Sequence, residues 1–132
     1  MAVSILTVTH GILGHELIGT TKSMLNSSLP LVCKSLSVTN TCNTDELLSA
    51  AQKLCVEIDQ GDGVLVLTDI FGSTPSNICN KIDTGTNIRV LAGLSLPMLI
   101  RTMNYPNLSL DKLAEKALSG ARDGIVDCTL NK

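Results

Sequence analysis

Residues 64–67, with the sequence VLVL, constrain the fold more than any other part of this chain. Every residue of the run is apolar, whereas a strand with one face in water alternates apolar and polar side chains. The run follows Gly61-Asp62-Gly63, which is typical of a turn. A short apolar run of this kind indicates a strand buried on both faces, as in a parallel sheet covered by helices.

Other segments predict the elements around that central strand. A β-rich run predicts a strand at 3–8, and residues 31–38 and 87–92 are further strand candidates. Apolar residues at helical spacing, together with capping residues, predict five helices. These are expected at 13–25, at 43–58 with Asn43 as cap, from Pro75 with Thr74 as cap, at 95–103, and at 109–124.

Strands that alternate with helices predict a doubly wound three-layer α/β sandwich with a mainly parallel sheet of four strands. Residues 125–130 are expected to add a short fifth strand at the C-terminal end. The length of 132 residues suits one core, so we expect a single domain over residues 1–132.

Composition excludes several classes of function. The formal net charge is -2, and Lys and Arg are scattered, which argues against nucleic-acid binding. The five cysteines have no metal-like spacing, and they indicate a reducing compartment. No basic leader or membrane-length apolar run occurs, so we expect a cytoplasmic protein.

Two residues with catalytic potential follow predicted strands. His10 comes after the first strand and Asp69 after the third. Chemistry in doubly wound folds collects at the carboxyl ends of the strands, and in a flavodoxin-like order these two strands are neighbours. A carboxylate that accepts one imidazole N–H leaves the other nitrogen free to attack. The sequence therefore predicts a His–Asp dyad.

An anion-binding site is predicted beside the dyad. The start of the helix near Pro75 supplies backbone N–H groups, Gly72 allows close approach, and the hydroxyls of Ser73 and Thr74 are additional donors. Neither a Walker A loop nor a GxGxxG motif occurs, so no cofactor is expected and a phosphoryl donor must come from elsewhere. A partner protein is a natural source.

Each of these features has a simpler interpretation. His10 alone could be a turn residue, Asp69 a loop carboxylate, and Ser73 to Pro75 only a helix cap. His15 and Glu16 could join His10 and Asp69 as metal ligands, but the spacing is not HExxH, and no metal is predicted. The coincidence at two strand ends favours the functional interpretation.

Three segments together resemble the mannose-family IIA component of the bacterial sugar phosphotransferase system. They are the His10-Gly11 pair after the first strand, residues 67–77 (LTDIFGSTPSN) and residues 91–99 (LAGLSLPML). The resemblance spans nearly the whole chain with matching order and spacing. Departures are Ile12, where well-known members carry an aromatic residue, and Phe71, near which they carry a tryptophan.

The resemblance implies that the histidine phosphocarrier protein phosphorylates His10, which then passes the group to a IIB component. It places Asp69 beside the histidine and the Thr74 hydroxyl near the phosphoryl group. It also implies a homodimer, often formed by exchange of a short C-terminal strand, here 126–130, and contact with the membrane only through IIC and IID components. Because the sequence ends at Lys132, we expect the acceptor to be a separate polypeptide.

Other functions remain open at this point. The chain could be a regulatory IIA protein of an incomplete phosphotransferase chain, or a non-enzymatic dimeric module that binds an anion or a partner without forming phosphohistidine. The phosphoryl-donor subunit for dihydroxyacetone kinase shares the fold, but the DIFGSTPSN stretch favours the mannose family. A hydrolase is disfavoured because no GxSxG motif occurs.

Overall fold

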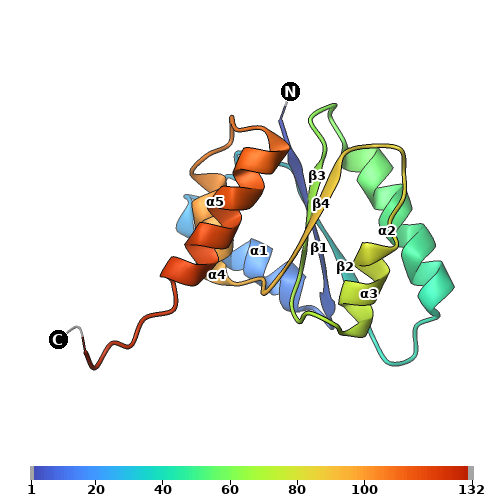
Figure 1. The fold of residues 1–132 in the computed structure, drawn as a ribbon, viewed down its shortest axis with the longest axis horizontal. Coiled ribbons are helices and arrows are strands. Elements are labelled where there is room, and N and C mark those ends of the chain that lie inside the picture. The colour runs from blue at the N-terminus through green and yellow to red at the C-terminus, as the bar shows by residue number, and fades with distance from the viewer. Residues whose placement is uncertain (1, 131–132) are drawn as a thin grey trace.

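The structure, a computed structural model, describes residues 2–130 and has three layers, a central sheet between two layers of helices (Figure 1). The strands are β1 (Ser4–His10), β2 (Cys33–Val38), β3 (Val64–Thr68) and β4 (Ile88–Ala92). The helices are α1 (Leu13–Met24), α2 (Thr44–Ile58), α3 (Thr74–Asn80), α4 (Leu96–Met103) and α5 (Leu110–Asp123).

The sheet has the strand order β2-β1-β3-β4, and every neighbouring pair is parallel. Helices α1, α4 and α5 cover one face, where they pack on side chains such as Ile5 and Leu67. Helices α2 and α3 cover the other face and pack on Leu6 and Val66. The predicted doubly wound α/β sandwich is confirmed, with a sheet that is parallel throughout.

Strand β3 is the central element that its sequence predicts. All five of its residues are buried, and the side chains of Val64 to Leu67 are inaccessible to solvent. Successive side chains point to opposite faces, so Val64 and Val66 join the core under α2 and α3, while Leu65 and Leu67 join the core under α1, α4 and α5.

The boundaries of the strands lie within two residues of the prediction, with one useful difference at the end of β1. This strand continues past Val8 because Thr9 and His10 stay in register with Ser37 and Val38 of β2. His10 is therefore the last residue of a strand and not part of a free turn. Its backbone position is fixed by the sheet.

Helix α3 begins one residue earlier than predicted. Ser73, with φ -82° and ψ 173°, occupies the N-cap position, and Thr74 is the first helical residue. Thr74 as N-cap was therefore a wrong prediction. The Ser73 hydroxyl donates to the Ile70 carbonyl and so closes the preceding loop. Ser73 is the last residue with an extended backbone before the helix.

The predicted fifth strand is absent from the described part of the chain. Residues 125–130 form turns and irregular structure, and Figure 1 shows this segment leading away from the sheet. A strand needs the unpaired edge of another strand beside it, and the segment does not reach one. Its apolar side chains are exposed as a result, with Ile125 at 84% and Leu130 at 81%.

Candidate functional site

His10 and Asp69 meet at the carboxyl edge of the sheet. His10 ends β1 and Asp69 follows β3 directly, and these strands are neighbours with Val8 opposite Thr68. The Nδ1 atom of His10 lies 2.9 Å from Oδ2 of Asp69. The predicted proximity of the two residues is confirmed.

Further hydrogen bonds fix the Asp69 carboxylate in this position. Oδ2 also accepts the backbone N–H of His10 at 3.1 Å, and Oδ1 accepts the backbone N–H of Ile70 at 3.0 Å. Both carboxylate oxygens are thus engaged, and the aspartate holds the backbone as well as the ring of His10. The imidazole therefore has a defined orientation before any partner binds.

Burial differs within the pair, since 8% of the Asp69 side chain and 50% of the His10 side chain are exposed. Burial by itself would raise the pKa of Asp69, but hydrogen bonds from the His10 ring, the His10 backbone and its own backbone N–H outweigh it. The pKa of Asp69 is consequently lowered, so the carboxylate is ionised at neutral pH.

An ionised carboxylate can only accept hydrogen bonds. The proton between the two residues therefore belongs to Nδ1 of His10, which donates to Oδ2 of Asp69. In a neutral imidazole Nε2 then keeps its lone pair, and half of the side chain is open to solvent. The geometry leaves Nε2 as the ring nitrogen of His10 that the carboxylate does not engage.

The β1–α1 connection holds the chain rigidly just after His10. Gly11 has φ +52°, a conformation that favours glycine, and its N–H donates to the Val38 carbonyl of β2. The Thr9 hydroxyl accepts the Gly14 N–H at 2.9 Å. A Cβ on Gly14 would lie 2.3 Å from Oγ1 of Thr7, so only glycine lets α1 approach β1 this closely.

The β3–α3 loop, residues 70–73, is closed on itself. The hydroxyl and the N–H of Ser73 both donate to the Ile70 carbonyl, at 2.6 and 3.3 Å. Gly72, with φ +82°, donates its N–H to the Ser76 hydroxyl at 3.3 Å. The loop is therefore a compact turn in which the donors of Gly72 and Ser73 are already engaged.

This closure alters the predicted anion site. The amides of Gly72 and Ser73 and the Ser73 hydroxyl donate within the loop, so they do not form a free cradle in this structure. The exposed residue Thr74 differs, because neither its N–H nor its hydroxyl finds a hydrogen-bond partner within residues 2–130. Among the three predicted anion ligands, Thr74 is the one whose donors are open.

Exposed apolar side chains flank the dyad on both loops, and we call these four residues the apolar rim. They are Ile12 at 62% exposure, Leu13 at 43%, Ile70 at 59% and Phe71 at 82%. Sequence reasoning recorded two of them only as departures from the family. The signal was available for Ile12, Ile70 and Phe71, because these apolar residues stand in turns, where polar residues are usual.

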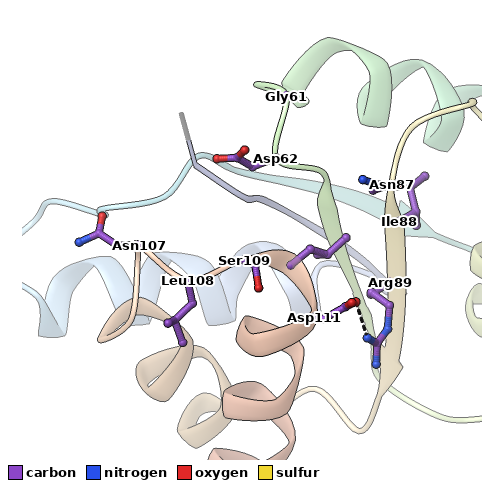
Figure 2. A pocket seen from close by; sticks show the side chains of 10 residues that line it. Gly61, Asp62, Asn87, Ile88, Arg89, Asn107, Leu108, Ser109 and Asp111 are labelled. Carbon is purple, nitrogen blue, oxygen red and sulfur yellow. Dashed lines mark hydrogen bonds and ion pairs between the residues drawn. The ribbon is translucent and has the colours of Figure 1, made fainter.

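A cavity of about 670 Å³ lies at the opposite, amino edge of the sheet (Figure 2). The loops before β3 and β4 and the start of α5 form its walls, and Arg89 and Asp111 make an ion pair across 2.8 Å there. None of the predicted site residues lines this cavity. Its size is therefore no guide to the chemistry indicated by the sequence.

The remaining titratable candidates are dispersed. His15 and Glu16 are exposed on α1, and within residues 2–130 no three His, Cys, Asp or Glu side chains gather as a metal site. Burial raises the pKa of the Cys55 thiol to about 11 and that of Cys79 to about 12, so these thiols are unreactive. In the same part of the chain no helix is long and apolar enough to cross a membrane.

Comparison with known families identifies the family of the chain. Residues 4–118 match the family model described as "PTS system fructose IIA component", where PTS denotes the phosphotransferase system. The chain belongs to this family, so it is a IIA-type component of a sugar phosphotransferase system. The resemblance found in the sequence is confirmed at this level.

A curated relative is the PTS system mannose-specific EIIAB component of Escherichia coli K12, which is 26% identical over 128 residues. The match covers 95% of this chain but 39% of that relative, so the chain spans about two fifths of the length of the curated relatives it matches.

Solved structures share the fold. The phosphotransferase component EIIA from Streptococcus agalactiae superposes with a TM-score of 0.82 at 24% identity, covering 97% of this chain and 98% of that one. The mannose/sorbose-specific IIA subunit from Enterococcus faecalis gives 0.79 at 23% identity, with 96% and 95% covered. At such identities the likeness concerns the fold.

Proposed function

We propose that this chain is a phosphoryl carrier that accepts a phosphoryl group on His10 from the histidine phosphocarrier protein and passes it to a IIB component. The observation that carries the proposal is the 2.9 Å contact between Nδ1 of His10 and Oδ2 of Asp69. Family membership supports the reaction class.

In the proposed step the Nε2 lone pair of His10 attacks phosphorus on the donor's phosphohistidine. A new P–N bond forms at His10 while the donor's P–N bond breaks, and its electron pair returns to the donor imidazole. The His10 ring becomes cationic as it bonds to phosphorus. The ionised Asp69, already bonded to Nδ1–H, stabilises that charge in the same way as the carboxylate of a catalytic triad.

Thr74 is the proposed first ligand of the transferred group. Its N–H and hydroxyl are uncommitted within residues 2–130, and donors of this kind suit the equatorial oxygens of a phosphoryl group. Gly72 and Ser73 can contribute their amides only after leaving Ser76 and the Ile70 carbonyl. In this proposal the amides of Gly72 and Ser73 bind the phosphoryl group only during transfer and do not form a binding site beforehand.

The apolar rim supports a protein as the phosphoryl donor. Ile70 and Phe71 lie in the loop that follows Asp69, whereas Ile12 lies in the turn after His10 and Leu13 is the first residue of α1. Exposed aromatic and aliphatic side chains around a reactive group are typical of the centre of a protein interface. The donor and the acceptor are proposed to dock here in turn.

The rest of the proposal follows from the family. It comprises a single domain over residues 1–132, a cytoplasmic location, a homodimer, and contact with the membrane only through IIC and IID components. The exposed Ile125, Val126 and Leu130 provide apolar surface that a second copy could cover.

Intact mass measurement after incubation with phosphoenolpyruvate, enzyme I and the histidine phosphocarrier protein tests the proposal. The wild-type chain should gain one acid-labile phosphoryl group, and His10→Ala should gain none. His15→Ala is the matched control and should behave as wild type, because His15 lies exposed on α1. If a competent donor yields no adduct, the chain is a non-enzymatic binding module instead.

A further inference from the structure

In the proposed function the hydrogen bond from Gly72 to Ser76 opens during transfer, but it has no role there before the donor docks. The N–H that donates is part of the Phe71–Gly72 peptide, and the acceptor is the hydroxyl of Ser76, 3.3 Å away. Ser76 lies in the first turn of α3 and is 2% exposed. A buried side chain thus reaches up to one peptide of an exposed loop.

The two Ser73 bonds to the Ile70 carbonyl close the turn around that peptide, but within residues 2–130 the bond to Ser76 is the one hydrogen bond made to the peptide itself. Gly72 has φ +82°, a conformation that favours glycine. A Cβ placed on it would meet no atom within 4 Å, so the backbone conformation and not a steric clash accounts for the glycine. Phe71 on the other side of the peptide is 82% exposed, so its side chain has little packing to hold it. The Ser76 hydroxyl is therefore the attachment that fixes the orientation of the Phe71–Gly72 peptide.

We propose that Ser76 is a positioning residue: its hydroxyl fixes the Phe71–Gly72 peptide and thereby holds Phe71 in the orientation that docks the phosphoryl donor. The inference rests on the proposed function. Holding an exposed aromatic side chain in its bound orientation lowers the entropy that docking must overcome. Ser76 does not touch the phosphoryl group in this account, and its effect on docking is exerted through Phe71.

The test compares the kinetics of phosphoryl transfer from the histidine phosphocarrier protein in five variants, one of which is Phe71→Ala. Ser76→Ala removes the hydroxyl, and Ser76→Cys keeps the side-chain size with a weak acceptor. Ser4→Ala is the matched control, because Ser4 is also a buried serine with one hydrogen bond, to the Ile58 carbonyl, and lies at the start of β1. The double variant Ser76→Ala/Phe71→Ala closes a mutant cycle.

We expect Ser76→Ala to raise KM for the donor by about three- to tenfold, which corresponds to the loss of one hydrogen bond. The value of kcat should change by less than about twofold. Ser76→Cys should fall between Ser76→Ala and wild type, and Ser4→Ala should match wild type. In the Phe71→Ala background, Ser76→Ala should have no further effect on KM. Amide exchange of Gly72 should accelerate in Ser76→Ala while core amides keep their protection.

Two results overturn the inference while leaving the proposed function intact. One is a wild-type KM in Ser76→Ala, and the other is an increase in KM that persists in full in the Phe71→Ala background, which would indicate general loosening. If the wild-type chain itself gains no phosphoryl group from a competent donor, the proposed function has failed and the inference fails with it.

Discussion

The two edges of the sheet differ in what they present to solvent. The amino edge has a cavity of about 670 Å³ lined by the Arg89–Asp111 ion pair and by Asp62. The carboxyl edge presents an imidazole held by a buried carboxylate, a threonine with open donors, and the apolar rim. The hollow and the reactive groups are thus at opposite ends of the molecule.

This difference teaches that the shape of a site depends on the size of its substrate. A small molecule needs an enclosing cavity, whereas a phosphoryl group delivered by another protein needs an exposed nucleophile and a surface for docking. The partner itself excludes water once it is bound. The predictions below use variants at both edges to challenge the assignment of function to the carboxyl edge.

Asp69→Asn should give the largest effect among variants that retain His10. The amide cannot stabilise the cationic ring, so kcat/KM for phosphoryl transfer should fall by about ten- to a hundredfold, the loss of a charge-assisted hydrogen bond. Transfer reactions quenched at a series of times and analysed by intact mass measure this rate. Asp111→Asn, the same change at the amino edge, is the control, and equal losses in both variants would refute the distinction between the edges.

Phe71→Ala should weaken donor binding. Removal of the most exposed side chain of the apolar rim is expected to raise KM for the donor by about tenfold, with a smaller change in kcat. Val56→Ala provides the comparison, because Val56 is 58% exposed on α2, outside the rim. Equal KM values for Phe71→Ala and wild type would remove the rim from the docking surface.

Acid should destabilise the wild type more than Asp69→Asn. The folded-state pKa of Asp69 is lowered, so its contribution to stability is present above the ordinary aspartate pKa, about 3.9, and is lost as pH falls through the folded value. Chemical unfolding at a series of pH values from 7 down to about 3 measures this. Parallel curves for the two proteins would contradict the lowered pKa.

Arg89→Ala at the amino edge should have the smallest effect. Its ion pair with Asp111 is largely exposed, so the free energy of unfolding should fall by about 1 kcal/mol or less. Phosphoryl transfer should stay within about twofold of wild type. A large loss of transfer in Arg89→Ala would instead indicate that the cavity takes part in function and would contradict the assignment of function to the carboxyl edge.

The parts of the fold and site that could be predicted depend on backbone periodicity. The VLVL run at 64–67 indicated a strand buried on both faces, and parallel neighbours place their carboxyl ends at one edge. The meeting of His10 and Asp69 followed once the first and third strands were taken as neighbours, as in a flavodoxin-like order. No side-chain detail was needed, because the sheet register brings the residues together.

The missed features depend on local geometry that periodicity does not encode. The positive φ of Gly72 and the buried hydroxyl of Ser76 turn the loop amides inward, so the predicted cradle is occupied by the loop itself. The strand expected at 125–130 failed for another reason, since a β-rich sequence forms a strand only where an unpaired edge is within reach.

The attachment of the phosphoryl group to one ring nitrogen tests the central claim most directly. Asp69 occupies Nδ1 of His10, so the account predicts that nuclear magnetic resonance of the phosphorylated protein, labelled with ¹⁵N in histidine, shows phosphorus coupled to Nε2 of His10. Phosphorus on Nδ1, or on any residue other than His10, would contradict the account.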